Sequence, residues 1–205
     1  EKDKEFKEKK YKEDKKPRKP KFDEDKKVMA RVAHGEVPLV VEIHRSEEIR
    51  SLLEKTEQFD RLRLILSGGT EALHHAEALA ERKIPVIVWP APMGSRRSDE
   101  YDGHDLSLAS QLHEAGVTVL IGSGGTDTSR DLRLLASLAV GHGLDPEAAF
   151  DAITLTVARA FDVGDRLGSL ERGKDADVLV LDGDPLDTTA RVQYVISNGQ
   201  VVVEP

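Results

Sequence analysis

The chain lacks cysteine, long apolar runs and a visible leader, and each absence removes a class of protein. Without cysteine there is neither a disulfide framework nor a thiolate metal site. No apolar run approaches the ~20 residues that cross a bilayer, so no membrane span is expected. No signal peptide is visible, although a chain that begins with Glu1 instead of Met can have lost its start. We therefore expect a soluble protein, either cytoplasmic or exported with its signal outside this sequence.

The body of the chain also lacks clustered positive charge. The first 27 residues hold 13 Lys and Arg against 9 Asp and Glu, which leaves 17 basic and 29 acidic residues for positions 28–205. An acidic body does not suit a nucleic-acid surface, because phosphates bind clustered positive charge. In the tail, acidic residues are interleaved with the lysines, so we expect a solvated helix or a mobile arm there.

Strands alternate with helices after a charged helical lead-in over residues 1–34, which includes helices at 1–16 and 22–33. The strands are expected at 37–44, 62–66, 85–89 and 117–121. The helices are expected at 46–58, with Ser46 as the cap, and at 71–82, 105–115, 129–142, 146–154 and 157–161. This alternation indicates an α/β fold with a parallel sheet, which fits either half of a (β/α)8 barrel or a doubly wound open sheet.

Residues 164–205 form a different unit. The run GDRLGSLERGKDADVLVLDGDPL at 164–186 contains an apolar stretch, 178–181, that predicts a short buried strand. A second strand at 192–197 leads through Asn198-Gly199, a strong hairpin signal, into a third strand at 200–203. The sequence therefore predicts a small β unit that closes the α/β domain.

This run closely resembles the C-terminal signature of the amidohydrolase superfamily, in particular of its imidazolonepropionase-like and prolidase-like members. Other resembling stretches follow in the same order: Gly35–Ile49, Gly69–Ala80, Ala115–Ile121 and Gly143–Ala160. The resemblance implies the C-terminal half of a (β/α)8, TIM-type barrel over 35–163 and part of a small β-sandwich domain over 164–205. It also implies that an N-terminal half is the partner, because half a barrel leaves sheet edges open. A homo-oligomer is a further option.

The resemblance implies a divalent metal, with zinc as the first choice, at the ends of the barrel strands. Such a metal lowers the pKa of a bound water to about 7 and polarises a scissile carbonyl. The family's histidine on the first of these strands falls here on Glu42, and His44 follows on the same face. These two residues are the metal-ligand candidates. A polar pair at a strand end, with His44 hydrogen-bonded to a neighbour, is the alternative.

Two segments are candidates for substrate binding. On the next strand, the family's histidine falls on Gly68. The turn Gly68-Gly69 can present backbone N–H groups to an anion or a substrate carboxylate, or it can be only a tight turn. Arg96 and Arg97 lie in the long loop 90–103, where they can clamp a substrate carboxylate or belong to a solvated loop.

The catalytic candidate is Asp127. In the family, an aspartate at the end of the last strand serves as metal ligand and general base, and that position falls here on Gly124. Asp127 takes the role only if the glycine-rich loop bends back toward the barrel mouth, which glycine permits. The alternative is a helix cap for the helix expected at 129–142.

Three functions follow from these residues. The first is a hydrolase that acts on C–N bonds of a small-molecule substrate through a metal-activated water, together with the N-terminal half. The second is a catalytically inactive, amidohydrolase-like binding or scaffold protein, because several ligand positions are changed. The third is a phosphate-binding α/β module, which the glycine-rich turns suggest and the absence of a P-loop lysine disfavours. The resemblance favours the first.

Overall fold

The computed structural model describes residues 24–90, 105–126 and 128–205, and the strands in these ranges form two separate sheets. Four parallel strands follow the order β1-β2-β3-β4, and three antiparallel strands follow the order β5-β6-β7. The strands are β1 Leu39–Ile43, β2 Leu64–Gly68, β3 Val86–Val88, β4 Val119–Ile121, β5 Val178–Leu181, β6 Val192–Ser197 and β7 Gln200–Val203. The predicted α/β class with a parallel sheet is therefore confirmed.

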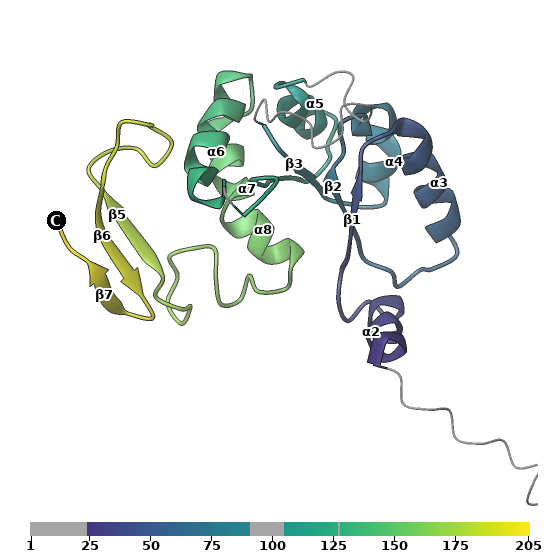
Figure 1. Ribbon diagram of the computed structural model, residues 1–205, viewed down its shortest axis with the longest axis horizontal. Helices are drawn as coiled ribbons and strands as arrows, with labels where there is room; N and C mark the ends of the chain where they lie inside the picture. Colours follow the sequence, from purple (N-terminus) through teal and green to yellow (C-terminus); the bar gives the residue numbers. More distant parts are fainter. Residues whose placement is uncertain (1–23, 91–104, 127) are drawn as a thin grey trace, which may run out of the picture.

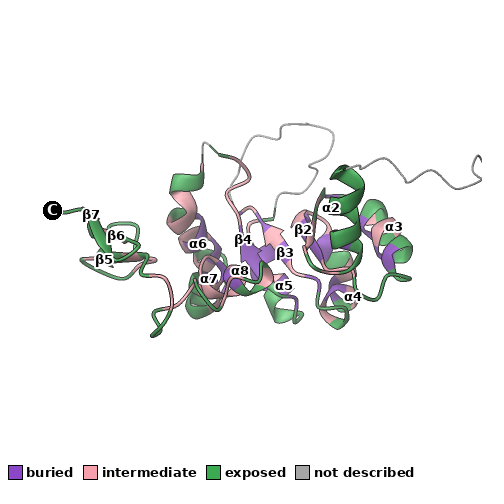
Figure 2. Ribbon diagram, turned by 90° about the horizontal axis from the view of Figure 1, so that it is seen from below, coloured by how far each residue is buried: buried purple, intermediate pink, exposed green. Residues whose placement is uncertain are grey.

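Helices connect the parallel strands and pack beside the sheet (Figure 1). The α-helices are α2 Glu24–Ala33, α3 Ser46–Thr56, α4 Ala76–Glu81, α5 Leu108–Glu114, α6 Leu132–Gly141, α7 Pro146–Ala152 and α8 Leu155–Ala160, and the 3-10 helices are η1 Ala72–His75 and η2 Ser129–Asp131. Helices α6, α7 and α8 lie between the two sheets in both views (Figures 1 and 2). Across the described ranges, no helix is long and apolar enough to span a membrane. The helix predicted at 1–16 lies outside these ranges.

The two faces of the parallel sheet have different surroundings. Partners in adjacent parallel strands point to the same side of the sheet, so the register defines two rows of side chains. The row that packs in the main hydrophobic core with α3, α4 and α5 consists of Val41, Leu66, Val86 and Val119. The opposite row runs from Glu42 through Ser67 and Ile87 to Leu120. Glu42 is exposed, Ser67 and Ile87 are half-buried and Leu120 is buried, so this face is only partly covered.

Side chains tie the loop after β1 to the loop after β2. Ser46 is not a cap, because the N-cap position is Arg45 and no side chain caps the helix there. Instead, the backbone N–H of Ser46 donates to the carboxylate of Glu71 at 2.6 Å. The helix predicted at 71–82 is correspondingly divided into η1 and α4, since both Glu71 and His75 bind Ser46 across the gap.

Helix α6 anchors the small sheet through polar contacts. The guanidinium of Arg133 donates to the carbonyl oxygens of Pro185, Asp187 and Ala190 at 2.8, 3.2 and 3.3 Å. All three carbonyls belong to the loop between β5 and β6. The predicted hairpin is confirmed, because Asn198 and Gly199 both have positive φ, at 49° and 75°, between β6 and β7.

The prediction that residues 178–181 form a buried strand is half wrong. The strand is present, but the side chains of Leu179 and Val180 are 49% and 40% exposed. The small sheet packs against no second sheet within the described residues, which leaves its apolar side chains open to solvent.

Replacing Arg133 with alanine is expected to loosen the small sheet from α6. The change removes a charged donor from three backbone carbonyls, at a cost of about 1–3 kcal/mol in the free energy of unfolding. Urea unfolding measures that cost, and limited proteolysis between residues 164 and 205 measures the loosening. Arg130→Ala is the matched control, because Arg130 is exposed and lies 3.8 Å from Asp131. Equal effects of the two substitutions would contradict the anchoring role of Arg133.

Candidate functional site

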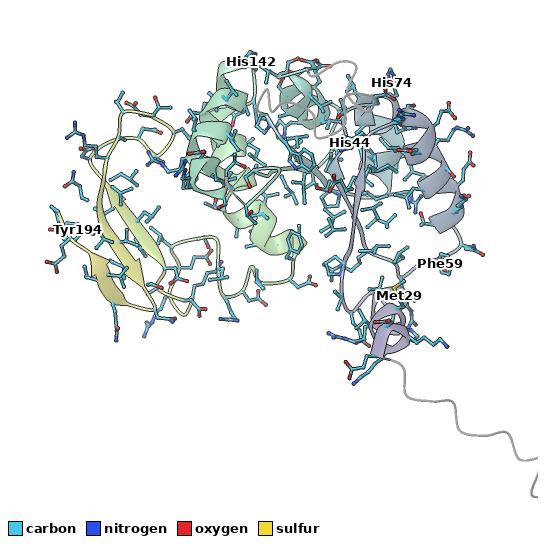
Figure 3. All side chains as sticks on the ribbon, in the orientation of Figure 1. Met29, His44, Phe59, His74, His142 and Tyr194 are labelled. Atoms are coloured by element: carbon cyan, nitrogen blue, oxygen red, sulfur yellow. The ribbon has the colours of Figure 1, made fainter. Side chains whose placement is uncertain are left out.

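The carboxyl ends of the parallel strands converge on one edge of the sheet. His44 follows β1, Gly68 ends β2, Trp89 follows β3 and Gly122 follows β4. Figure 3 shows His44 at the end of β1, beside the neighbouring strands. Open parallel sheets and barrels bind their ligands at this edge. These strand ends are therefore the candidate site.

His44 is a buried residue with defined partners. Its side chain is only 5% exposed, and its Nδ1 lies 2.8 Å from Oγ1 of Thr70. The imidazole meets the indole of Trp89 in a T-shaped arrangement, with ring centroids 5.4 Å apart and an interplanar angle of 64°. Edge-to-face ring pairs of this kind are stabilising. The sequence alternative of a hydrogen-bonded His44 at a strand end agrees with this geometry.

Gly68 has no room for a side chain. Its φ is +89°, and a Cβ at this position would lie 2.7 Å from Nε2 and 2.9 Å from Nδ1 of His44. The imidazole thus occupies the space that a side chain at position 68 would need. The next residue, Gly69, donates its N–H to the carbonyl of Ile43 at 2.8 Å. An anion at this turn would therefore need other donors than the Gly69 amide.

Glu42 has a different environment from that of His44. It is exposed in the row shared with Ser67 and Ile87, whereas the imidazole is buried against Gly68 and Trp89. In the described part of the chain, no three His, Asp or Glu side chains gather closely enough to hold a metal ion. The metal roles of Glu42 and His44 stay predictions.

Three of the predicted site residues lie outside the described residues. These are the substrate-binding candidates Arg96 and Arg97 and the catalytic candidate Asp127. The glycine-rich segment that precedes Asp127 is described, and hydrogen bonds within the segment hold it. Ser123 Oγ donates to the carbonyl of Gly125 at 2.8 Å, and Thr128 Oγ1 donates to the carbonyl of Ser123 at 2.7 Å.

The indole of Trp89 supports this glycine-rich segment. A Cβ at Gly124, whose φ is +68°, would lie 3.2 Å from Cδ2 of Trp89, and a Cβ at Gly122 would lie 3.3 Å from Cδ1. The backbone N–H of Gly122 also donates to the carbonyl of Val88 at 2.9 Å. The segment thus lies against the ring at the strand ends.

A small hollow of about 30 Å³ opens beside these rings, lined by Gly68, Thr70, Trp89, Asp105 and Leu106 among others. This volume holds about one water-sized group. The pKa of Asp105 is lowered, chiefly by the hydroxyl of Ser107 and then by its backbone N–H, which both donate to the carboxylate. Asp105 therefore carries the one ionised side chain among the described residues that line the hollow.

Sequence reasoning missed three participants in this region: Thr70, Trp89 and His75. The sequence signal for Trp89 was its place directly after the apolar run of β3. His75 Nε2 lies 2.9 Å from both the hydroxyl and the carbonyl of Ser46. His75 on η1 thus joins Ser46 at the start of α3.

Comparison with known proteins gives one family over nearly the whole chain. The model of the amidohydrolase family matches residues 21–203. An imidazolonepropionase of Thermoanaerobacter pseudethanolicus is 35% identical over 125 residues, which are 58% of this chain and 30% of that protein. A crystal structure of an amidohydrolase from Thermotoga maritima MSB8 has a TM-score of 0.83 at 26% identity, and the match covers 99% of this chain and 53% of that one.

An adenosine deaminase from Xanthomonas campestris, crystallised with bound zinc, shares the fold with a TM-score of 0.56 at 23% identity. The match covers 81% of this chain and 46% of that one. This chain therefore spans about half of the length of these proteins or less.

Alanine at position 44 is expected to destabilise the fold much more than alanine at position 42. His44→Ala removes a buried ring, its bond to Thr70 and its contact with Trp89, which together cost about 2 kcal/mol or more. Glu42→Ala changes an exposed side chain, for which about 0.5 kcal/mol or less is expected. Chemical unfolding of both variants measures the difference, and similar losses would show that the two residues share one structural role.

Proposed function

The chain belongs to the amidohydrolase family, and on this premise we propose that it is half of a (β/α)8 barrel that binds a small molecule without a binuclear metal centre. In this proposal, residues 1–34 are a lead-in, 35–163 form the second half of the barrel and 164–205 supply strands of a small β-sandwich. The partner is an N-terminal half that completes both units.

Open sheet surfaces support the half-barrel. The outer strands β1 and β4 each have one neighbour, and the face that carries Glu42 is only partly covered. The small sheet exposes Tyr194 and Val201–Val203 as well, so it too has apolar surface for a further partner. The Thermotoga amidohydrolase is matched over 53% of its length. The remaining 47% of a chain of that size is enough for the other half.

One observation carries the proposal that a binuclear centre is absent: His44 lies in the space that a ligand side chain at position 68 would occupy. Position 68 is where the family resemblance places a metal ligand, and glycine has no side chain to offer. A binuclear centre needs its bridging and terminal ligands together. The strand ends of this half therefore do not supply that ligand of a two-metal hydrolytic centre.

The second candidate function is hydrolysis of C–N bonds through a metal-activated water. The names of the relatives favour it, because they include an imidazolonepropionase and an adenosine deaminase with bound zinc. Asp127 as general base, Glu42 and His44 as ligands, and Arg96 and Arg97 as a substrate clamp belong to this candidate. The described side chains do not gather as a metal site, so the N-terminal half would supply most of the ligands.

Metal content of the assembled protein distinguishes the two candidates. Native mass spectrometry of the protein purified without chelator, with the N-terminal half present, is expected to show a complete complex without bound zinc. The binding role predicts this result because this half lacks a side chain at position 68. Two zinc ions per complex would contradict the proposal, and either one or two would support the hydrolase and justify a substrate screen.

A pair of variants assigns any zinc that is found. If Glu42 and His44 are ligands, the double substitution Glu42→Ala, His44→Ala abolishes stoichiometric zinc. Arg130→Ala serves as the control, since Arg130 is exposed and no metal role is proposed for it. Zinc retained by the double variant would assign the metal to the N-terminal half.

A further inference from the structure

Two rings and three glycines meet at the strand ends. We infer that the rings of His44 and Trp89 occupy the place of a metal centre, by filling the side-chain space of Gly68 and Gly124, while Ile87 together with Trp89 closes the space at Gly122. The inference rests on the proposed barrel half, but it concerns only contacts within this chain. It assigns a positioning role to Trp89, which no sequence motif indicated.

The first contact closes the end of β2. A Cβ at Gly68 would overlap the imidazole of His44, which is held by Thr70 and by the edge-to-face contact with Trp89. Because the imidazole is buried, it cannot move aside into solvent without losing these partners. Two features thus exclude a side chain at position 68: the imidazole of His44 and the positive φ of the backbone.

The second contact closes the end of β4. A Cβ at Gly124 would be 3.2–3.4 Å from three ring atoms of Trp89. At Gly122, a Cβ would be 2.6 Å from Cγ2 of Ile87 and 3.3 Å from the indole. These distances are at or below the closest ordinary carbon contacts, so the backbone lies directly on the ring.

The two contacts form one unit, because Trp89 touches both His44 and the glycine-rich segment. This unit joins residues that follow β1, β3 and β4. Its imidazole lies against Gly68 at the end of β2. A side chain at position 68 therefore needs the imidazole to be displaced, and one at position 124 needs the indole to shift by a few tenths of an ångström. The same contact fixes the course of residues 122–125, so Trp89 positions the segment that leads toward Asp127.

A double-mutant cycle in the 205-residue chain tests the steric claim. Gly68→Ala is expected to lower the urea midpoint several times more than Gly173→Ala does. The two glycines have nearly the same φ, +89° and +96°, but a Cβ at Gly173 meets nothing within 4 Å. The pair thus separates ring overlap from the backbone cost of alanine at positive φ. In the His44→Ala background, the loss caused by Gly68→Ala should fall to that of Gly173→Ala.

An equal loss for Gly68→Ala and Gly173→Ala in the wild-type background would overturn the inference. So would a loss at position 68 that is unchanged by His44→Ala. Either result is obtained without reference to metal, so it is independent of the test of the proposed function.

Zinc titration gives a second readout, since Trp89 is the only tryptophan of the chain. Its fluorescence is expected not to change with zinc, because the rings leave no ligand set at the strand ends. Zinc that binds stoichiometrically, shifts the emission of Trp89 and is lost in His44→Ala would overturn the inference. Zinc that binds the assembled protein but leaves the emission of the 205-residue chain unchanged contradicts only the proposed function, and the inference stands.

Discussion

The packing of the His44 imidazole over Gly68 is the contact on which the strand-end arrangement depends. It requires glycine at position 68, it orients the ring toward Thr70, and it brings the indole of Trp89 to the middle of the sheet edge. The glycine-rich segment after β4 then rests on that indole. Trp89 contacts both His44 and this segment, so the strand ends form one packed unit.

Most of the fold was predictable from sequence because its signals are local. Apolar runs bounded by turn residues gave the seven strands, and Asn198-Gly199 gave the hairpin, since both residues take the positive φ that this turn requires. The failures occurred where distant side chains intervene. Residues 71–82 begin as a 3-10 turn because Glu71 and His75 bind Ser46, and that contact has no local signature.

The candidate site was less predictable for the same reason. The sequence showed that Glu42 and Gly68 stand where relatives of this kind carry histidines, but it gave no indication of what fills the space. That information lies in contacts between distant residues: His44 contacts Thr70 and Trp89, which are 26 and 45 positions away. Trp89 in particular follows a strand as any buried residue might, and only its neighbours give it a role.

Membership of a family fixes the fold more firmly than the chemistry, and this chain shows why. The core consists of apolar residues of one sheet face and its helices, and it reaches the strand ends through Ile43, Val88 and Ile121. The polar and glycine positions beyond these residues, such as His44 and Gly68, can differ between relatives while this core is kept. Gly68 and Gly124 have positive φ and each lies against a ring. A ligand side chain at either position therefore requires a change in the adjacent ring as well.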